Sequence, residues 1–388
     1  MIYNENTINT PAYVCYENKL KNNLEIFKRI QEESGVKVLL ALKGFAFSAA
    51  MPLVKEYLQG CTCSGLWESL FAKEYVGKEV HTYAPAFNEE DLKEIIKISN
   101  HLVVNSLNEY KKVKKLQNEI PVSNSLGIRC NLEFSLAPRE IYNPCGKYSR
   151  LGIKAKDLLE SDIVVDGLHF HALCEESFES LESVFAVFEE KFLKPYLAKH
   201  PLKWINFGGG HHITKEGYKI DELIKFLKEI KSKYKLEIYL EPGEAVGWQT
   251  GELVASVLDI IENEKKIAIL DICAEAHMPD TIIMPYTSEV KNAKILASRD
   301  ELADVKSTKT SYVLTGNSCL AGDIMGEYEF NQELKIGDRV VFCDQIHYTI
   351  VKNTTFNGVK LPSLIYVDEK GNIKNQKDFN FNDYSRRN

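Results

Sequence analysis

The sequence lacks three features that would narrow its function at once. No apolar stretch is long enough for a membrane-spanning helix, no long run of basic residues occurs, and no Cys-x-x-Cys pair is spaced for a metal. The 48 basic and 55 acidic side chains give a net charge of −7. We therefore expect neither a membrane nor a nucleic acid as partner.

The nine cysteines are odd in number and scattered along the chain. This usage is typical of reduced thiols and does not suggest a disulfide framework. Residues 1–13 contain no basic stretch followed by an apolar core, so no targeting segment is expected at this end. These features predict a soluble, cytoplasmic protein.

The hydrophobic pattern predicts an α/β protein with a repeating unit. Between residues 36 and 243, a short apolar run alternates with a helical stretch eight times. The near-continuous hydrophobicity of these runs indicates strands buried on both faces. The predicted strands are 36–42, 60–64, 79–84, 101–105, 125–131, 166–171, 204–209 and 236–243.

Eight alternating units are typical of the (β/α)8 barrel of TIM type, in which catalytic groups lie at the carboxyl ends of the strands. An open, doubly wound sheet is the alternative, and it would need a topological switch point that a sequence does not show. After residue 243 the chain has strand patterns without long helices, which predicts a second, antiparallel β domain. The strands expected there are 251–261, 265–272, 310–316 and 338–343.

The chain is long enough for two domains, because a single core stops growing at smaller sizes than 388 residues. We assign residues 25–250 to the barrel, and residues 1–24 with 251–388 to the β domain. Residues 11–17 have strand character, and we expect them to join the β domain. The polar tail from about residue 372 is expected to be loosely ordered.

Polar residues collect where predicted strands end. Lys43 follows the first strand, where burial would lower its pKa towards a neutral, nucleophilic amine suited to a Schiff base. Taken alone, one lysine among many is better explained as a surface residue that ends a strand.

The sixth strand ends His169-Phe170-His171, and the alternation of side chains puts both imidazoles on one face. Three interpretations remain open for them. They could bind a metal in a barrel hydrolase with His211 or His212 as further ligands. One could instead stack on a flat cofactor, or both could be core histidines.

The last two strands add further polar features. Gly208, Gly209 and Gly210 follow the seventh strand, where backbone N–H groups could approach a phosphate closely. Glu241 ends the eighth strand and could keep a pyridine nitrogen protonated. A mobile glycine loop and a salt-bridging Glu are the alternatives. Together with Lys43 and an imidazole, these residues indicate pyridoxal phosphate as the cofactor.

Sequence motifs along nearly the whole chain carry a family resemblance. They are TPAYVCYE, ALKGF, CSGLWES, KYSRLGI, HFHALCE, FGGGHH, EPGEAV, AHMPDTIIMPY, GNSCLAGD and HYTIVKNTTFNG. With these motifs the sequence resembles the alanine-racemase-fold decarboxylases that use pyridoxal phosphate, among them the ornithine and diaminopimelate decarboxylases. The carboxynorspermidine (carboxyspermidine) decarboxylases are the most similar group.

The resemblance implies a role for each matching residue of the barrel. Lys43 would hold pyridoxal 5′-phosphate covalently, and His171 would stack on its ring. Gly208 to Gly210 would hold its phosphate, while Glu241 would pair with its ring nitrogen.

Further matching residues have implied roles around the same site. Glu68 and Arg150 would organise it, and Tyr348 of the β domain would reach the phosphate. Cys319 would enter the site of the partner subunit in a homodimer, so that each active site is composite, and would return a proton to the product.

Departures from the family pattern bear on the substrate. Glu244 stands where ornithine and diaminopimelate decarboxylases generally have arginine, and it could accept hydrogen bonds from a protonated amine. Asp280 is the second matching acid. In the ornithine type an Asp follows the cysteine, whereas here Leu320 follows Cys319 and the next acid is Asp323.

The resemblance, together with these departures, implies a lyase of polyamine biosynthesis that decarboxylates carboxynorspermidine or carboxyspermidine to norspermidine or spermidine. The two precursors differ by one methylene, which is worth only about 1–3 kcal/mol, so no preference between them is predicted. A diaminopimelate or ornithine decarboxylase is the nearest alternative. A barrel metallohydrolase and a non-catalytic cofactor carrier are the others.

Overall fold

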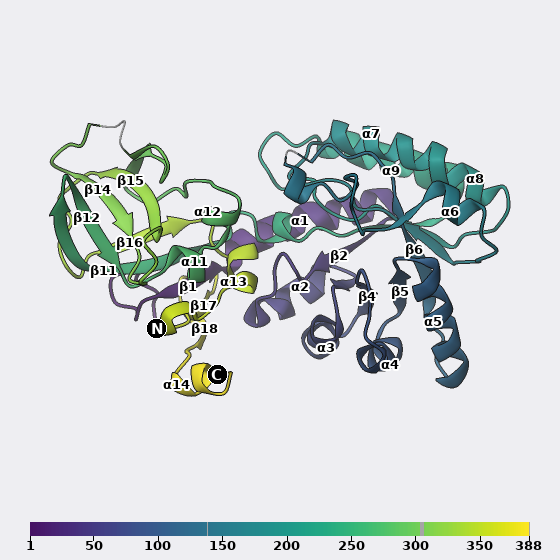
Figure 1. Ribbon diagram of the computed structural model, residues 1–388, viewed down its shortest axis with the longest axis horizontal. Coiled ribbons are helices and arrows are strands. Elements are labelled where there is room, and N and C mark those ends of the chain that lie inside the picture. The colour runs from purple at the N-terminus through teal and green to yellow at the C-terminus, as the bar shows by residue number, and fades with distance from the viewer. Residues whose placement is uncertain (138, 303–305, 388) are drawn as a thin grey trace. The chain divides into compact units, whose positions relative to one another are not determined.

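The computed structural model describes residues 1–137, 139–302 and 306–387 of the chain. They form two compact units, one of residues 22–246 and one of residues 1–21 and 247–388 (Figure 1). Within these described residues, no helix is both long and apolar enough to cross a membrane.

The unit of residues 22–246 contains a closed barrel of eight parallel strands. Neighbouring strands pair in sequence order, and the pairs β5–β6 and β10–β2 complete the ring. The predicted barrel is confirmed, and the open-sheet alternative is wrong because the sheet has no free edge between these strands. The strands are β2 (Lys37–Ala41), β3 (Gly60–Cys63), β4 (Glu79–Tyr83), β5 (His101–Val104), β6 (Ser125–Asn131), β8 (Gly167–His169), β9 (Trp204–Asn206) and β10 (Glu237–Leu240). A short strand, β7 (Ile153–Lys154), pairs with β6 outside the ring.

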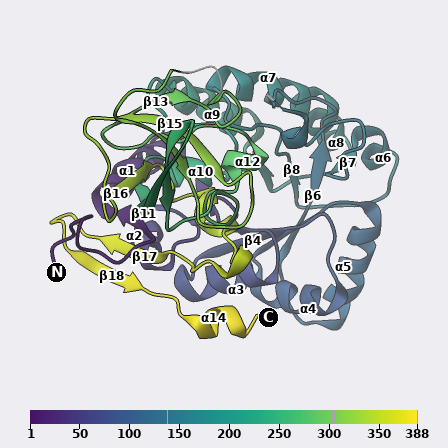
Figure 2. The same cartoon turned by 60° about the vertical axis from the view of Figure 1, so that its left-hand side comes forward.

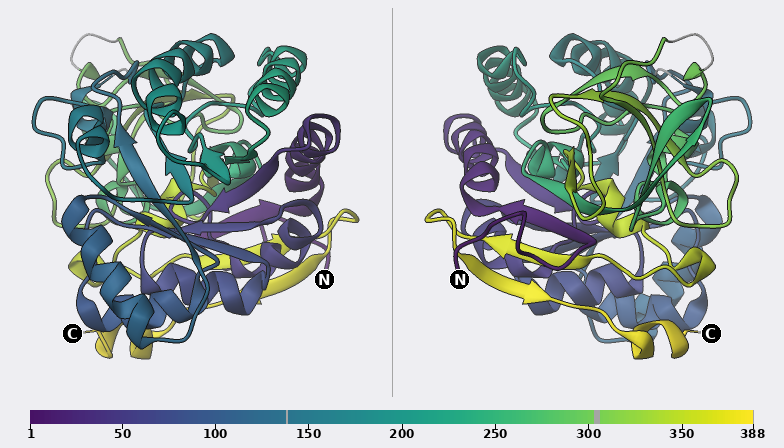
Figure 3. Two further views of the ribbon diagram at one scale, coloured as in Figure 1. Left: turned by 90° about the vertical axis from the view of Figure 1, so that its right-hand side faces the viewer. Right: turned by 90° about the vertical axis from the view of Figure 1, so that its left-hand side faces the viewer.

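Helices surround the strands of this unit (Figure 3). The amphipathic ones bury an apolar stripe, as α9 does with Leu223, Ile224, Leu227 and Ile230. Several begin at a side-chain cap that satisfies a free backbone N–H, such as Asn88 before α4. The helices of the chain up to residue 247 are α1 (Glu17–Ser34), α2 (Met51–Tyr57), α3 (Leu66–Tyr75), α4 (Glu89–Ile98), α5 (Leu107–Glu119), α6 (Ala155–Leu159), α7 (Phe178–Phe188), α8 (Lys194–Leu197), α9 (Ile220–Tyr234) and α10 (Glu244–Gly247).

Side chains fill the interior of the barrel. Trp204 is 2% exposed and packs with Leu39, Val103 and Tyr239. Gly167 makes room for the indole, because a Cβ at this position would lie 2.0 Å from the Trp204 ring. The barrel is therefore a packed core, with separate groups of polar residues at its two ends.

The unit of residues 1–21 and 247–388 is built on a nine-stranded sheet in which most neighbours are antiparallel. The predicted antiparallel β domain is confirmed, and two of its strand pairs, β1–β17 and β12–β14, are parallel. The strands are β1 (Ala12–Tyr16), β11 (Gly251–Asn263), β12 (Lys265–Leu270), β13 (Ala293–Ala297), β14 (Ser311–Thr315), β15 (Ile324–Phe330), β16 (Arg339–Cys343), β17 (Ser363–Val367) and β18 (Ile373–Lys377).

The N-terminal strand is central to this sheet. β1 pairs with β11 on one side and with β17 on the other, as the strand pattern of residues 11–17 predicted. Val14, Val254, Val341 and Ile365 share one apolar cluster, so residues from four separate parts of the chain form the core.

The expectation of a loosely ordered tail is wrong. Residues Ile373–Lys377 form β18 beside β17 (Figure 2), and α14 (Phe381–Ser385) follows. Asn380 and Asp383 cap α14 in reciprocal fashion. Pairing with a neighbouring strand satisfies the backbone of a polar segment, and polar composition alone does not reveal that pairing. The eighth barrel strand also ends earlier than predicted, at Leu240, so Glu241 lies just beyond it.

Candidate active site

A cavity of about 690 Å³ lies at the carboxyl ends of the barrel strands. Five of the residues predicted for the site line it, namely Lys43, Arg150, His171, Gly209 and Glu241. Lys43, His171, Gly209 and Glu241 follow β2, β8, β9 and β10, and Arg150 belongs to the segment after β6. The fold thus brings together residues that are separated by up to about 200 positions in the sequence.

Lys43 lies in the turn directly after β2 and reaches the open space of the cavity, while protein surrounds its other sides. This burial lowers the pKa of its amine, and the nearby charge of Arg129 lowers it further. Glu241 and Glu68 act in the opposite direction but more weakly. Among the described residues, no carboxylate forms an ion pair with Lys43. The amine is therefore available as a nucleophile.

Glu241 is a largely buried carboxylate, with its side chain 11% exposed. Its Oε1 accepts a hydrogen bond from Asn206 Nδ2 at 2.7 Å, and its Oε2 lies 3.4 Å from Nε2 of His169. Burial would raise the pKa of Glu241, but His169 and Asn206 outweigh it and hold the pKa well below the usual range. Glu241 is consequently ionised and can accept a hydrogen bond from a protonated ring nitrogen.

His171 presents a neutral imidazole to the cavity. Its Nδ1 accepts a hydrogen bond from the backbone N–H of Gly209 at 3.1 Å, which fixes the ring and puts its proton on Nε2. Burial, and after it the charges of Lys43 and Arg129, hold the pKa of His171 well below its ordinary value. A flat, uncharged ring in a fixed orientation suits stacking on an aromatic cofactor.

The glycine segment approaches neighbouring backbone too closely for any side chain. A Cβ on Gly209 would lie 2.1 Å from the carbonyl oxygen of Glu241, and one on Gly210, whose φ is +94°, would lie 2.0 Å from that of Leu173. Two of the amides already have acceptors, because Gly208 N–H donates to Asn206 Oδ1 at 2.8 Å and Gly209 N–H donates to His171. Gly208 to Gly210, which we call the glycine wall, therefore leave no room for side chains.

These observations fit pyridoxal phosphate. The cavity offers an amine without an ion pair for the aldehyde, an ionised carboxylate for the ring nitrogen, a flat imidazole for the ring face and, at Gly209, backbone without a side chain for the phosphate.

Glu68 and Arg150 lie close to this cavity in different ways. Glu68 Oε2 accepts a hydrogen bond from the backbone N–H of Ser64, a cavity residue, at 2.6 Å, and burial raises the pKa of Glu68. Arg150 is exposed and lines the cavity, and its carbonyl accepts a hydrogen bond from Asn105 Nδ2 at 2.8 Å.

Glu244 begins α10, beyond the cavity wall itself. Its Oε2 lies 3.8 Å from Nε2 of His212, and its side chain is 21% exposed. Three residues after Glu241, it places a second carboxylate near the same end of the barrel.

Cys319 and Tyr348 belong to the other unit and are described within it. Cys319 is exposed, and its backbone N–H donates to Asn357 Oδ1 at 2.5 Å. Tyr348 begins α13 (Tyr348–Lys352), and the ammonium of Lys352 lies 4.7 Å from the centre of its ring.

The two predicted acids of that unit differ in their surroundings. Asp280 holds the ammonium of Lys352 with both carboxylate oxygens, at 2.7 and 2.8 Å. Asp323 is 3% exposed and accepts hydrogen bonds from the Ala274 N–H at 2.7 Å and the Ser318 hydroxyl at 2.6 Å. Because these donors already occupy its carboxylate, Asp323 is better placed to hold the backbone near Cys319 than to bind a substrate.

The metallohydrolase alternative required His169, His171 and His211 to converge. His211 instead pairs with the hydroxyl of Tyr218 at 2.8 Å. Among the described residues, one group of three side chains is close enough together to bind a metal ion. It contains none of these histidines and lies elsewhere in the barrel. That alternative is therefore wrong.

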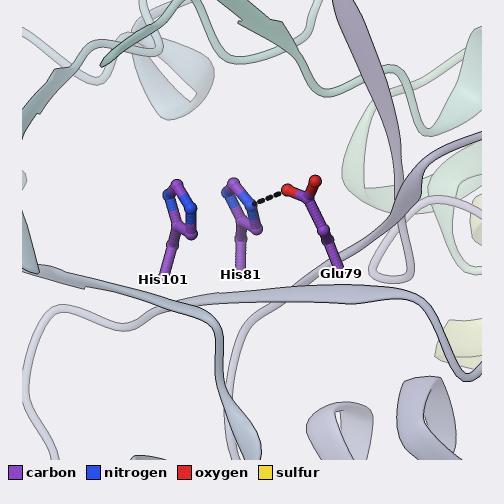
Figure 4. A group of neighbouring side chains, drawn as sticks. All are labelled: Glu79, His81 and His101. Atoms are coloured by element: carbon purple, nitrogen blue, oxygen red, sulfur yellow. Dashed lines mark hydrogen bonds and ion pairs between the residues drawn. The ribbon is translucent and has the colours of Figure 1, made fainter. Parts of the chain in front are cut away.

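This other trio consists of Glu79, His81 and His101 (Figure 4), at the amino ends of β4 and β5. The two imidazole rings stack 4.0 Å apart with their planes 11° from parallel, so their lone pairs do not converge on one point. Glu79 is already paired with Lys37 at 2.8 Å. The geometry favours a network of ion pairs and stacked rings over a metal centre.

Sequence reasoning missed Arg129 and Asn206. Arg129 lines the cavity, donates to the carbonyl of His171 at 3.1 Å and lies 4.7 Å from the ring centre of Tyr83. Asn206 connects Glu241 to the glycine wall. Asn206 is the polar residue of an otherwise apolar strand, and Arg129 is the one charged residue of β6. These exceptions were the available signal.

Comparison with known proteins assigns a chemistry to this geometry. Residues 12–345 match the family model described as "Pyridoxal-dependent decarboxylase, C-terminal sheet domain". The chain is 61% identical to the carboxynorspermidine/carboxyspermidine decarboxylase of Campylobacter jejuni, over 98% of this chain and 99% of the relative. It is 40% identical to the carboxyaminopropylagmatine decarboxylase of a Synechocystis species, over 97% and 95% of the two chains.

A solved structure agrees with these sequence matches. The crystal structure of carboxynorspermidine decarboxylase from Campylobacter jejuni, complexed with norspermidine, superposes with a TM-score of 0.90 at 58% identity. The match covers 98% of this chain and all of the other.

Proposed function

The chain belongs to the family of pyridoxal-dependent decarboxylases, and from that premise we propose that it decarboxylates carboxynorspermidine, carboxyspermidine or both in polyamine biosynthesis. The observation that carries the proposal is the single cavity in which Lys43, His171, Gly209 and Glu241 meet. The relative of 61% identity, named for these two substrates, supports the choice of substrate class.

Pyridoxal phosphate, when bound, supplies an electron sink for the charge left on the substrate when carbon dioxide departs. Lys43, with its lowered pKa, would hold the cofactor and yield its place to the substrate amine. Glu241 would keep a proton on the ring nitrogen, and the neutral ring of His171 would lie against the cofactor. The glycine wall would leave room for the phosphate, with Tyr348 as a further contact.

Two carboxylates are proposed to select the cationic tail of the substrate. Glu244 would accept hydrogen bonds from an ammonium group where an arginine would repel one. Asp280 holds the ammonium of Lys352 with both oxygens, so a substrate ammonium would have to displace Lys352 to reach it. These acids disfavour diaminopimelate, whose distal end carries a carboxylate.

We also propose a homodimer in which Cys319 of the partner subunit completes each site and returns a proton to the product. Cys319 is exposed. Leu320, its neighbour in sequence, is 40% exposed, and Phe356, which precedes the Asn357 that binds the Cys319 N–H, is 44% exposed. Exposed apolar side chains beside an exposed thiol suit a contact with a second copy. A two-fold dimer would make two equivalent composite sites.

The substrate proposal is tested by steady-state kinetics of the purified, cofactor-loaded protein. Carboxynorspermidine, carboxyspermidine, carboxyaminopropylagmatine, diaminopimelate and ornithine are compared at equal concentrations. The highest kcat/KM is expected for one of the first two. A preference for diaminopimelate or ornithine contradicts the proposal, and a preference for carboxyaminopropylagmatine moves the chain to the specificity of its 40% relative.

The shared site is tested by mixing inactive Lys43→Ala and Cys319→Ala homodimers and allowing the subunits to exchange. Each mixed dimer then has one doubly altered site and one intact site. Random exchange makes half of the dimers mixed, so about a quarter of the wild-type activity should return. If exchange is verified by native mass spectrometry and no activity returns, Cys319 acts within its own chain or not at all.

A further inference from the structure

The imidazole of His169 is an ionisable group of the cavity that has no role in the proposed chemistry. It lines the cavity, yet it is 3% exposed, and it is the last residue of β8, two positions before His171. His169 is level with Arg129 of β6 and Asn206 of β9 in the strand register. It therefore belongs to a row of polar side chains beneath Glu241.

Neither ring nitrogen of His169 has a hydrogen-bond partner among the described residues. A buried polar ring of this kind costs stability relative to an apolar residue, so its presence calls for a function. The nearest charged group is Glu241, whose Oε2 lies 3.4 Å from Nε2 of His169. The ring edge of His169 also faces Tyr83, at 5.7 Å between ring centres.

The other oxygen of Glu241 is already held, since Asn206 Nδ2 donates to Oε1 at 2.7 Å. A carboxylate held at one oxygen can still turn about its last bond. A second donor at Oε2 would remove that freedom and fix the direction of the remaining lone pairs. His169 is the side chain that stands at this position.

We propose that His169 is a positioning residue, which holds Glu241 through Nε2–H and thereby keeps the ring nitrogen of the bound cofactor protonated. Nε2 is the donor, so the neutral ring carries its proton there and leaves Nδ1 unprotonated. Burial lowers the pKa of His169 and favours the neutral ring, and a hydrogen bond donated by that ring would lower the pKa of Glu241 and favour the carboxylate. The inference rests on the proposed function, because Glu241 must face a pyridine nitrogen for it to matter.

Two substitutions separate donation from mere bulk. His169→Gln places an amide nitrogen near the position of Nε2, whereas His169→Asn, one methylene shorter, places it near Nδ1, which faces no partner. His101→Gln removes a different imidazole, one at the amino end of β5, and serves as the control. All three proteins are loaded with pyridoxal phosphate labelled with ¹⁵N in the ring, and the ¹⁵N chemical shift is measured beside kcat and KM.

The wild type, His101→Gln and His169→Gln should show a protonated ring nitrogen at pH 8. In His169→Asn the shift should move towards that of neutral pyridine. Its kcat should fall by about 10- to 100-fold, the scale found when the partner of a directly acting group is lost, with KM changed less than about threefold. If His169→Asn does not fold, His169→Met takes its place with the same expectation.

The proposal is overturned if the Asn or Met variant keeps the wild-type shift and a kcat within about twofold, or if His169→Gln fails as badly as they do. Failure of the proposed function would look different. In that case the wild type itself would show no protonated ring nitrogen or would not decarboxylate the polyamine precursors.

Discussion

At the amino ends of the barrel strands, Lys37, Glu79 and His101 are the first residues of β2, β4 and β5. Lys37 forms an ion pair with Glu79, and His101 packs against the rings of His81 and Tyr239. At the carboxyl ends, Lys43 faces a cavity of about 690 Å³ and forms no ion pair in the part of the chain that the structure describes. Both ends hold ionisable groups in the same barrel. At the amino end Lys37 and Glu79 compensate each other, whereas at the carboxyl end the amine of Lys43 has no ion-pair partner among the described residues.

The difference has a physical consequence. Removing one partner of a paired, buried charge destabilises the protein, because the other charge is left without compensation. A buried group without a partner lowers stability but keeps its reactivity for a ligand. Substitutions at the carboxyl end should therefore change activity with little effect on unfolding, and those at the amino end should do the reverse.

The largest effect is expected at Lys43. Lys43→Ala should lower kcat by at least about 10³-fold, the scale of losing one directly acting group, because the cofactor loses its covalent attachment. Removing an unpaired buried amine should leave the midpoint of urea unfolding of the cofactor-free protein unchanged or higher. A variant that unfolds much more readily would show that Lys43 has a structural role. Borohydride reduction followed by peptide mapping should place the cofactor on Lys43 in the wild type.

A smaller effect is expected at Glu244. Glu244→Gln should lower kcat/KM for carboxynorspermidine by about 10- to 100-fold, which corresponds to a lost charged hydrogen bond of about 1.5–3 kcal/mol. The exposed Glu216 provides a matched control, and Glu216→Gln should have no effect. Unchanged kcat/KM in Glu244→Gln would remove Glu244 from the substrate site.

At the amino end, Glu79→Gln should act on stability. Lys37 and Tyr239 would lose the carboxylate to which both donate, which should lower the free energy of unfolding by about 1–3 kcal/mol. The value is modest because the side chains of Lys37 and Glu79 are 33% and 26% exposed. Urea titrations measure the change, with the exposed Glu90→Gln as control. A tenfold loss of kcat in a folded, loaded Glu79→Gln protein would contradict the division between the two ends.

The smallest effect concerns the pH dependence of stability. Burial, and after it His81, lower the pKa of His101 to about 3, below the value of about 6.5 in an unfolded chain. The unfolded state therefore binds more protons, and the contribution of His101 is fully present above about pH 6.5 and is lost as the pH falls towards 3. His101→Gln should reduce the loss of unfolding free energy between pH 7 and pH 5 by about 1 kcal/mol, allowing for partial exposure. Identical slopes in wild type and variant would refute the assignment.

The sequence contained the signals for the barrel and for most of the cavity residues. The eight apolar runs predicted all eight barrel strands because parallel strands are buried on both faces and cannot alternate with polar residues. Lys43, His171 and Glu241 stood out because they follow those strands, and the barrel brings strand ends together. β18 escaped prediction because its residues are polar and its order depends on pairing with β17.

Other features required coordinates. The hydrogen bond from Asn206 to Glu241 joins residues 35 positions apart, and no local pattern indicates it. Arg129 was visible as a charge in an apolar strand, but only its contacts with the carbonyl of His171 and the ring of Tyr83 place it in the site. The separation of His211 from His169 and His171, which excludes the metal site, likewise follows from the tertiary structure of the barrel.

The sequence by itself determined the fold class and the chemical types of the side chains in the site. Hydrophobic periodicity follows from which faces are buried, and strand ends follow from where that periodicity stops. Tertiary structure decided which ionisable groups meet, and so which are compensated. Three properties depend on distances across the barrel and on exclusion of water: the pKa of Lys43, the ionisation of Glu241 and the pairing of Lys37 with Glu79. Neither the distances nor the exclusion of water can be deduced from the order of the residues.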